Sequence, residues 1–291
     1  MTRLASTSTM LVLALVATGC PAQGDEEAGA VAVDETSAAM ASSIDMVGVM
    51  RSFEGGIGLA LLPVATARRE ALRAARDSLL GSVRNRLCVS VDTDEESYVE
   101  VTFRECPTGL FRLFELDGSL RADIEFDTVP CALGECPIAV RYTVSTPRLR
   151  MGARFGVRFV ELAGSWSLYD PIDATAPTEW DSGYMVENHL GRRIAMSSRT
   201  RWVVDLNQCV TFSLDGELQV DGRADVDLVA LSARGVTRCP GQCPQAGTVE
   251  LAYGRGELLA WTYTGEDTAL VTGPRGQRFE RVLPCAEDVA E

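Results

Sequence analysis

The stretch Leu120-Arg-Ala-Asp-Ile-Glu-Phe-Asp127 decides the fold class, because apolar and charged residues alternate along it without a break. Successive side chains of a β-strand point to opposite faces of a sheet, so this stretch has one apolar and one polar face. Such strands are typical of antiparallel sheets with one buried and one solvated side. Further strands are predicted at 99–104, 138–145, 149–159, 192–206, 208–214, 217–231, 247–253, 256–264, 268–272 and 277–284. The chain is therefore predicted to be mainly β.

Turn signals separate the predicted strands. Asp-Gly pairs occur at 117–118, 215–216 and 221–222, and Gly-Pro-Arg-Gly occupies 273–276. Glycine supplies the positive φ that tight turns require, and proline presets φ for a turn, so we expect the chain to reverse at these points. Residues 171–183, which include two prolines, are predicted to connect two groups of strands.

The region 44–86 has a helical pattern instead of a strand pattern. Leu72, Ala75, Leu79 and Val83 recur at spacings of three and four residues, and arginines populate the other side. This predicts an amphipathic α-helix from Thr66 to about residue 86, with Thr66 as its N-cap. A shorter helix is predicted at 44–53, before a glycine-rich break. The main interpretation is a helix packed on the sheet, and the alternative is contact with a membrane surface.

A weak internal repeat lies on either side of the 171–183 connector. Each copy has a cysteine, then Leu-Asp-Gly with a further leucine after it, and then two cysteines of which the second precedes a proline. The corresponding positions are Cys106, 116–118, Cys131 and Cys136 in the first copy and Cys209, 214–216, Cys239 and Cys243 in the second. We therefore predict two related β modules, 87–170 and 184–291, with a chance match as the alternative.

The first twenty residues have the features of an export signal. Arg3 precedes a short apolar run at 10–16, and small residues lead up to Cys20. This apolar run is shorter than the roughly 20 residues that a permanent membrane-spanning helix needs. Ala17-Thr-Gly-Cys20 resembles the lipobox of bacterial lipoproteins. The resemblance implies cleavage after Gly19, acylation of Cys20 and attachment of the protein to a membrane through that residue.

The residues around this point refine the expected location. Pro21 follows the cysteine where an aspartate would signal inner-membrane retention in that family, so the outer membrane or cell surface is favoured. Residues 20–43 are small and acidic and have too little apolar surface to fold, which predicts a solvated tether. Removal of residues 1–19 leaves 26 basic and 41 acidic residues, a net charge of 26 − 41 = −15. Such an acidic chain is not expected to bind nucleic acid.

Eight cysteines remain after Cys20 is set aside, and an even number in an exported protein favours disulfides. These residues are Cys88, Cys106, Cys131, Cys136, Cys209, Cys239, Cys243 and Cys285. Pairing within modules would join Cys88 to Cys106, Cys131 to Cys136, Cys209 to Cys285 and Cys239 to Cys243. A zinc site on the two closely spaced pairs is the alternative, but the single histidine and an oxidising compartment count against it.

The sequence lacks the common catalytic and cofactor motifs. With His189 as the only histidine, a Ser-His-Asp or Cys-His arrangement would have to include it, and a structural histidine is the favoured interpretation. No phosphate loop, dinucleotide fingerprint or Gly-x-Ser-x-Gly elbow occurs, and no cofactor is expected. Asp225 and Asp227 are a carboxylate pair of the kind that cleaves glycosides, but their positions favour the polar face of an ordinary strand.

Three surface features are candidates for binding. The acidic residues Asp92, Asp94, Glu95 and Glu96 form a loop that calcium could use, although a solvated turn is favoured. Arg150, Arg154 and Arg158 form a basic stripe that could receive an acidic protein or glycan, the alternative being pairing with the acidic residues at 123–127. Tryptophans 166, 180, 202 and 261, with Tyr263, are either core residues or platforms for a sugar.

These features favour a lipid-anchored cell-envelope protein with a non-enzymatic interaction or structural role. Its membrane partner would be reached through Cys20, and its protein or glycan partner is unknown. The first alternative is a carrier that holds a lipid or other apolar ligand between the helix and the sheet. These two hypotheses differ in whether the helix face of Leu72, Leu79 and Val83 fills the concavity of the sheet. A hydrolase is the second alternative.

Overall fold

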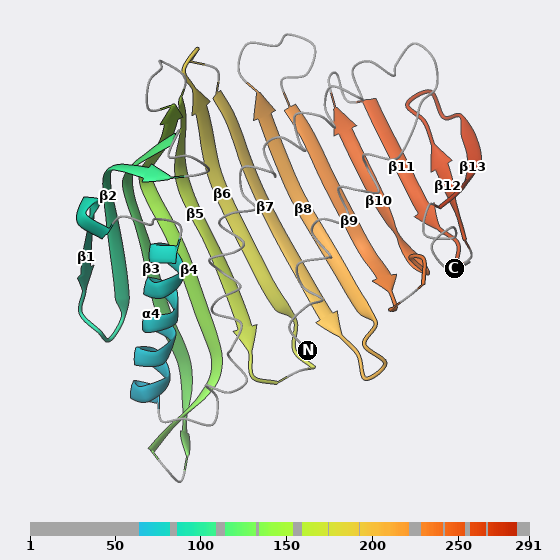
Figure 1. Ribbon diagram of the computed structural model, residues 1–291. Coiled ribbons are helices and arrows are strands. Elements are labelled where there is room, and N and C mark those ends of the chain that lie inside the picture. Colours follow the sequence, from blue (N-terminus) through green and yellow to red (C-terminus); the bar gives the residue numbers. More distant parts are fainter. Residues whose placement is uncertain are drawn as a thin grey trace, which may run out of the picture. The chain divides into compact units, whose positions relative to one another are not determined.

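The computed structural model describes residues 64–81, 86–108, 114–131, 134–153, 159–173, 175–191, 193–220, 228–240, 242–253, 257–265 and 267–283. Within these ranges the chain forms one α-helix, one short 3-10 helix and thirteen strands (Figure 1). The prediction of a mainly β, antiparallel fold is confirmed. The signal and lipobox residues, the tether and the short helix expected at 44–53 lie outside the described residues.

The helical elements are α4 (Val64–Gly81) and η1 (Arg86–Cys88). The strands are β1 (Val89–Thr93), β2 (Tyr98–Thr108), β3 (Phe114–Cys131), β4 (Gly134–Ala153), β5 (Phe159–Pro171), β6 (Thr178–Asn188), β7 (Arg193–Val204), β8 (Val210–Val220), β9 (Leu228–Arg238), β10 (Ala246–Tyr253), β11 (Glu257–Tyr263), β12 (Thr268–Thr272) and β13 (Arg278–Val282). They form one antiparallel sheet in which each strand lies beside its neighbours in sequence. This order is a simple meander, which needs only short connections between strands.

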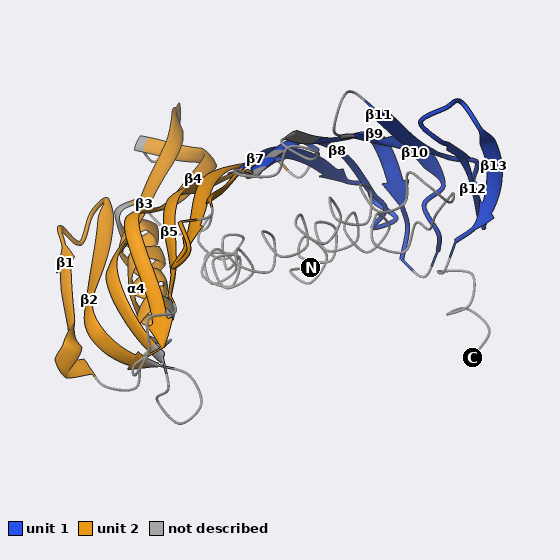
Figure 2. Cartoon of the chain, turned by 90° about the horizontal axis from the view of Figure 1, so that it is seen from above, with its two compact units in different colours: residues 1–41, 174–179, 196–291 blue, residues 42–173, 180–195 orange. Residues whose placement is uncertain are grey.

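The chain divides into two compact units, coloured in Figure 2. Unit 2 comprises residues 42–173 and 180–195, and unit 1 comprises residues 1–41, 174–179 and 196–291. This division does not follow the connector expected at 171–183, because the later part of β6 belongs to unit 2. The relationship of the two predicted modules by an internal repeat stays a prediction.

Unit 2 has a helix packed on its sheet. Helix α4 contacts β2 and β3 and, to a smaller extent, β4 (Figures 1 and 2). Its buried side chains recur at helical spacing and include Leu72 and Leu79, at 3% and 1% exposure. They pack against the apolar side of the alternating strands, where Val101 and Ile124 are also buried. The amphipathic stripe seen in the sequence is thus the face that contacts the sheet.

Unit 1 has the same strand alternation in β8 to β12. Its buried side chains lie on one face and include Leu214, Val249, Leu251, Trp261 and Val271. The register places several of them opposite one another, for example Val249 beside Trp261 and Trp261 beside Val271. Aromatic and β-branched cross-strand neighbours of this kind stabilise a sheet.

Two of the predicted turns are wrong. Asp117-Gly118 lies inside β3 and Asp215-Gly216 lies inside β8, and in both places the strand continues. Gly118 has φ +120° and sits where the register with the neighbouring strands shifts, so the glycine accommodates a β-bulge. A side chain there would meet the Arg148 carbonyl oxygen at 2.1 Å. The Gly-Pro-Arg-Gly turn at 273–276 is confirmed by the hydrogen bond from Gly276 N–H to Gly273 O.

Other strand boundaries also differ from the prediction. The strands expected at 138–145 and 149–159 are largely one strand, β4, which bends at a register shift between Thr146 and Leu149. Strand β5 was not predicted, because Gly164 interrupts its alternation of apolar residues. Strand β6 begins at Thr178, within the expected connector. The strand expected at 217–231 is divided between β8 and β9, and the Asp-Gly pair at 221–222 lies outside the described residues.

Three disulfides are described. Cys88 is joined to Cys106 and Cys131 to Cys136, as expected from within-module pairing. The third joins Cys209 to Cys239, so the expected pairs Cys209–Cys285 and Cys239–Cys243 are wrong. The reason is the register: Val210 lies opposite Arg238, which makes the flanking Cys209 and Cys239 neighbours with Cα atoms 4.0 Å apart.

The disulfides also bear on the location of the protein and on the zinc alternative. Disulfides persist in oxidising compartments, so they indicate an extracytoplasmic protein. Cysteines 131, 136, 239 and 243 are all disulfide-bonded and therefore do not supply the free thiolates that a zinc site needs. Cys285 lies outside the described residues. No helix in the described ranges is both long and apolar enough to cross a membrane.

Candidate functional site

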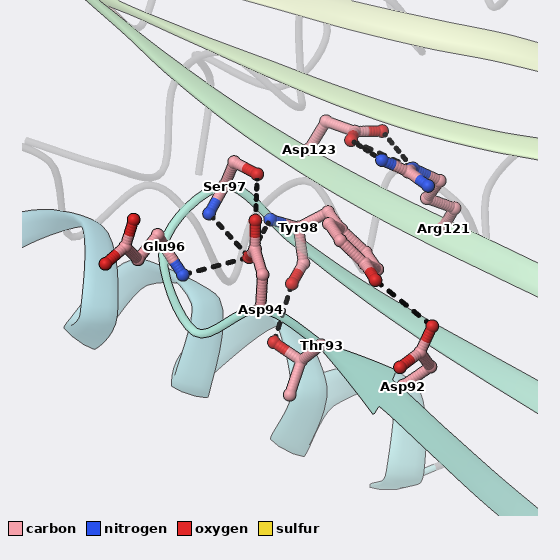
Figure 3. Close-up of polar contacts among 8 residues, drawn as sticks. All are labelled: Asp92, Thr93, Asp94, Glu96, Ser97, Tyr98, Arg121 and Asp123. Carbon is pink, nitrogen blue, oxygen red and sulfur yellow. Dashed lines mark hydrogen bonds and ion pairs between the residues drawn. The ribbon is translucent and has the colours of Figure 1, made fainter.

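A connected group of polar contacts lies in the acidic hairpin between β1 and β2, which the sequence analysis considered as a calcium site (Figure 3). One Asp94 carboxylate oxygen accepts hydrogen bonds from the backbone N–H groups of Glu96, Ser97 and Tyr98, at 2.9, 2.8 and 3.1 Å. The other oxygen accepts a bond from the Ser97 hydroxyl. These bonds, led by that from the Ser97 hydroxyl, hold the pKa of Asp94 well below its usual range.

The second side of the hairpin is closed by Thr93. Its hydroxyl donates to the Tyr98 carbonyl oxygen at 2.6 Å and accepts from Glu95 N–H at 3.0 Å. Glu95 adopts φ +60°, the left-handed conformation that this tight turn requires. The hairpin is therefore held by its own side chains and backbone, in the manner of an Asx turn.

The arrangement does not favour a calcium site. The Asp94 oxygens point to backbone donors of the same turn, whereas calcium requires six to eight converging oxygen ligands. In the described part of the chain, no three acidic, histidine or cysteine side chains are placed to hold a metal ion. The favoured interpretation of this loop, a solvated turn, agrees with these contacts.

A second polar group, missed in the sequence, lies beside the hairpin on the solvated face of β2 and β3. The Arg121 guanidinium lies 4.0 Å from the centre of the Tyr98 ring and forms an ion pair with Asp123 at 2.9 Å. The Tyr98 hydroxyl donates to Asp92 at 3.1 Å. The bond to Asp123 raises the pKa of Arg121, and the bond to Asp92 raises that of Tyr98.

The register of the strands explains this group. Tyr98 lies opposite Asp123, and Glu100 lies opposite Arg121, so the side chains converge from two adjacent strands. The alternation at 120–127 placed Arg121 and Asp123 on the polar face, but only the register shows that Tyr98 lies between them and Asp92. Tyr98, Arg121 and Asp123 therefore each have a described partner within this group or in Asp92.

The predicted basic stripe is described only at Arg150, since Arg154 and Arg158 lie outside the described residues. The Arg150 guanidinium lies 4.1 Å from the centre of the Phe159 ring. Asp117 and Glu161 flank it in register on the two neighbouring strands, so acidic residues other than those expected at 123–127 surround it. Arg141 stacks on Tyr169 in a similar way, at 5.1 Å.

The residues considered as catalytic groups of a hydrolase do not form a site within the described ranges. His189 follows β6 in a turn, is half-buried, and donates its backbone N–H to the Phe159 carbonyl at 3.0 Å. Its turn is closed by the Asn188 side chain, which accepts from Leu190 N–H. Asp225 and Asp227 lie outside the described residues. The structural interpretation of His189 agrees with its place in this turn.

The aromatic residues considered as platforms for a sugar differ in how far they are buried. Trp166 and Trp261 are 1% and 6% exposed, and Tyr263 is 6% exposed, so none of them presents a face to a soluble sugar. Burial raises the pKa of Tyr263 to about 12. Trp180 and Trp202 are half-buried. Trp166 stacks on Tyr184 with ring centres 5.4 Å apart, which makes this pair a core contact.

The carrier hypothesis requires space for a ligand between the apolar face of α4 and the sheet. This face of α4 is covered by the sheet. Leu72 and Leu79 are buried between α4 and the sheet, and Arg68 lies over the Phe126 ring at 5.6 Å. Val83 lies outside the described residues. A helix face packed in this way fills the space that an apolar ligand would need, which counts against the carrier hypothesis at this position.

Comparisons of the chain with protein-family models, curated proteins and solved structures give no match.

Proposed function

We propose that this protein is a lipid-anchored component of the bacterial cell envelope with a non-enzymatic interaction or structural role. Two independent lines support the proposal. The lipobox-like sequence ending at Cys20 provides the anchor, and the disulfides agree with export. Two or three acyl chains anchor a folded domain stably, since each buried CH2 contributes about 0.8 kcal/mol.

One observation supports the non-enzymatic role. The side chains that could take part in catalysis are used in structural contacts. Asp94 accepts hydrogen bonds from its own turn, Arg121 pairs with Asp123, and the described cysteines are bonded. An active site would instead need a nucleophile, acid or base held toward an open space. Within the described ranges, the structure offers strands, turns and disulfides that stiffen a sheet.

The solvated face of unit 2 is the surface that we assign to the partner. It carries arginines that lie over aromatic rings, Arg121 over Tyr98, Arg141 over Tyr169 and Arg150 over Phe159. Such pairs combine a flat apolar area with guanidinium hydrogen-bond donors, which suits a protein segment or a glycan. Pro21 after the lipidated cysteine favours an outer-membrane or surface position for this face.

Anchoring is tested with the full chain produced in a bacterial host that processes lipoproteins. Cells are fed an alkyne-tagged palmitate, and label is compared between the wild type, Cys20→Ala, and a control with Cys131→Ala and Cys136→Ala together. We expect label and membrane association in the wild type and the control, and loss of both in Cys20→Ala. Undiminished label in Cys20→Ala would overturn the anchoring proposal.

The interaction role is tested by chemical cross-linking of intact envelopes. We expect a discrete cross-linked adduct with the wild type, and its loss in Arg150→Glu, which reverses one charge on the solvated face. Arg73→Glu on the exposed side of α4 is the matched control and should keep the adduct. An adduct that is equally abundant in both variants would contradict the assignment of this face. Absence of any adduct in the wild type would contradict the interaction role.

A further inference from the structure

Strand β1 forms one edge of the described sheet, because it pairs with β2 on one side and with no described strand on the other (Figures 1 and 2). An edge strand presents unpaired backbone N–H and C=O groups, to which another chain can add a strand. We call the side of the sheet that contacts α4 the inner face. Val91 lies on this face, because it is opposite the buried Val101, and it is 41% exposed. The edge therefore offers both backbone groups and an apolar side chain to a partner.

The ladder of hydrogen bonds shows which backbone groups of β1 face away from β2. Ile124 N–H donates to the Ser97 carbonyl oxygen at 2.9 Å, and hydrogen-bonded pairs alternate with non-bonded pairs along antiparallel strands. Every second residue of β2 after Ser97 therefore bonds to β3, and the residues between them bond to β1. One of these is Glu100, whose partner on β1 is Asp92. The residues of β1 whose N–H and C=O groups face the open edge are thus Val89, Val91 and Thr93.

These three residues are symmetric about Val91, so the edge is complementary to a second copy of itself. A two-fold axis at Val91 places this residue opposite its own equivalent in the second copy, and Val89 opposite Thr93. Each of the three pairs exchanges two hydrogen bonds, which gives about six in total. Of the antiparallel registers available to two β1 strands, only this one pairs all three residues. The backbone of β1 therefore fits a second copy in this register better than in any other.

The side chains of β1 agree with the same register. Ser90 lies opposite Asp92 of the second copy on the solvated face, where the hydroxyl can donate to the carboxylate. On the inner face the two Val91 side chains are neighbours, and each covers part of the apolar surface that the other exposes. A register centred on Asp92 would instead place two carboxylates opposite each other, and like charges in that position destabilise a sheet.

The charges at the two ends of β1 have opposite signs. Arg86 precedes the strand in η1, and Asp94, Glu95 and Glu96 lie in the turn that follows it; all of these residues are exposed. Antiparallel pairing places the basic end of each copy beside the acidic end of the other, whereas parallel pairing would bring like charges together. The chain carries a net charge of −14, so two copies repel each other at long range, and this local complementarity favours approach through β1.

The other edge of the described sheet, β13, is protected against such pairing. Gly273 N–H donates to the Gln277 carbonyl oxygen and Leu283 N–H to the Asp267 carbonyl oxygen, each at 2.8 Å, which fixes the ladder between β12 and β13. The residues whose backbone groups face this edge are therefore Arg278, Glu280 and Val282. A two-fold axis at Glu280 would place two glutamates opposite each other. Three of the five residues of β13 are charged, against one in β1, and charged residues on an edge strand discourage the addition of another strand.

We propose that β1 pairs with β1 of a second copy of this chain, antiparallel and about a two-fold axis at Val91. The occupant of the edge is thus the protein itself, and two sheets join into one. Both Val91 side chains lie on the inner face, so the axis is perpendicular to the sheet at this point and the solvated faces of the two β1–β2 hairpins lie on the same side.

The dimer goes beyond the proposed function and does not depend on it. A contact between two five-residue strands is small compared with the roughly 1,000 Å² of a stable interface, so we expect a dimer in equilibrium with monomers. If the proposed function is also correct, the dimer presents the solvated face of unit 2 twice to one partner, which raises the avidity of binding.

Cysteine trapping in intact envelopes tests the contact directly. Val91→Cys is introduced into the full-length chain, because the Cα atoms of a hydrogen-bonded antiparallel pair are about 5.5 Å apart, within the range that a disulfide spans. We expect a covalent dimer joined at position 91, identified by mass spectrometry of the non-reduced peptides. Val282→Cys, at a 65% exposed position of β13, is the matched control and should remain monomeric. Equal amounts of dimer from both variants would indicate random collision and would overturn the proposal.

The register is tested with two further variants. Ser90→Cys and Asp92→Cys are predicted to face each other across the axis, whereas neither faces its own equivalent. We expect several-fold more covalent dimer when the two variants are produced together in one cell than when either is produced alone. A Ser90→Cys protein that dimerises as efficiently alone would contradict the proposed axis. A disulfide-linked adduct with another protein, in place of the dimer, would assign the edge to a strand of that protein and would also overturn the proposal.

Proline substitution gives an independent readout in solution. Val91→Pro removes an N–H that faces the second copy and keeps the bonds to β2, and proline is tolerated at such edge positions. Sedimentation of the full-length chain in detergent should show an association constant at least about tenfold lower, because each copy loses a hydrogen bond. Val282→Pro, the same substitution at an outward-facing residue of β13, should dimerise like the wild type. A folded Val91→Pro protein that dimerises equally well would overturn the proposal, as would a wild type that stays monomeric and is not trapped. If Val91→Pro does not fold, the trapping result decides.

Discussion

Units 1 and 2 both bury apolar residues of alternating strands, but among the described residues only the strands of unit 2 have a helix packed on them. In unit 2, Ile124 and Val101 are buried beneath α4, at 1% and 0% exposure. In unit 1, Val249 and Val271 are equally buried, at 2% and 3%, although no described helix contacts their strands. The alternation of apolar residues therefore determines which face of a strand is buried, and it does not determine the element that buries it.

The two units also differ in how their strands are tied together. In unit 2, one disulfide joins β2 to the residue that precedes β1, and another closes the β3–β4 hairpin. In unit 1, the described disulfide joins residues that flank β8 and β9, 30 residues apart in sequence. The longer loop removes more entropy from the unfolded chain, so a single disulfide contributes more to unit 1 than the hairpin bridge contributes to unit 2.

The largest effect is expected from truncating one core side chain in each unit. Trp261→Ala should lower the free energy of unfolding of unit 1 by about 3–5 kcal/mol, and Leu79→Ala should lower that of unit 2 by about 2–5 kcal/mol. Both side chains are buried, so each truncation leaves a cavity. Urea denaturation followed by hydrogen exchange of peptides from each unit measures both effects.

Arg73→Ala is the control for α4, because this side chain is exposed and should change stability by less than about 0.5 kcal/mol. A Leu79→Ala effect as small as that of the control would mean that α4 does not stabilise the unit 2 sheet.

Removal of disulfides should give the next largest effect. Replacing Cys209 and Cys239 by serine should cost about 3.5 kcal/mol, and replacing Cys131 and Cys136 should cost about 2 kcal/mol, from the loop lengths that each bond closes. Paired serine variants avoid leaving a free thiol. Thermal or urea unfolding of the two double variants measures the difference. Equal losses would show that loop length does not govern the contribution of these bonds.

Alkaline pH should destabilise both units through one buried tyrosine in each. Burial raises the pKa of Tyr263 in unit 1 to about 12 and also raises the pKa of Tyr142 in unit 2. Because each folded-state pKa lies above the unfolded value, the stabilisation is complete below pH 10 and is lost as pH rises through the folded pKa. For Tyr263 the loss approaches about 2–3 kcal/mol near pH 12.

Phenylalanine variants separate the contributions of the two tyrosines. Tyr263→Phe should reduce the loss of stability at alkaline pH in unit 1 only, and Tyr142→Phe should reduce it in unit 2 only. Hydrogen exchange of peptides from each unit between pH 8 and pH 11, corrected for the intrinsic exchange rate, resolves the two. If unit 1 of the Tyr263→Phe variant still loses stability as the pH rises, the effect belongs to another group.

A small effect is expected at the β1–β2 hairpin of unit 2, where Asp94 accepts hydrogen bonds from three backbone N–H groups and the Ser97 hydroxyl, whereas Asp205 of unit 1 accepts them from the N–H groups of Asn207 and Cys209. The pKa of Asp94 is lowered in the folded state, so its stabilisation is present above the unfolded pKa of about 4 and is lost as pH falls through the folded value. Asp94→Asn should remove this acid dependence. The Asp94 carboxyl shift, followed by NMR from pH 5 to pH 1.5, measures the titration, and a midpoint near 4 would contradict the prediction.

Much of the fold is determined by local patterns in the sequence. Alternation at 120–127 identifies the inner and solvated faces of β3, and spacing at Leu72, Ala75 and Leu79 identifies the face of α4 that contacts the sheet. Cys131 and Cys136 are five residues apart, so a bond between them needs only a hairpin. In each case the physical reason is the same, because neighbours in the chain are neighbours in space.

The remainder depends on contacts between distant residues, which no local pattern encodes. The Asp-Gly pairs predicted a turn, but pairing with adjacent strands kept Gly118 in a bulge within β3. The pairing of Cys209 with Cys239 follows from the register of β8 and β9, and the Tyr98–Arg121 group follows from that of β2 and β3. Local patterns in the sequence were sufficient to identify the buried face of β3 and the buried face of α4. Which strands, cysteines and charged side chains contact one another depends on the register, and packing across the whole sheet sets that register.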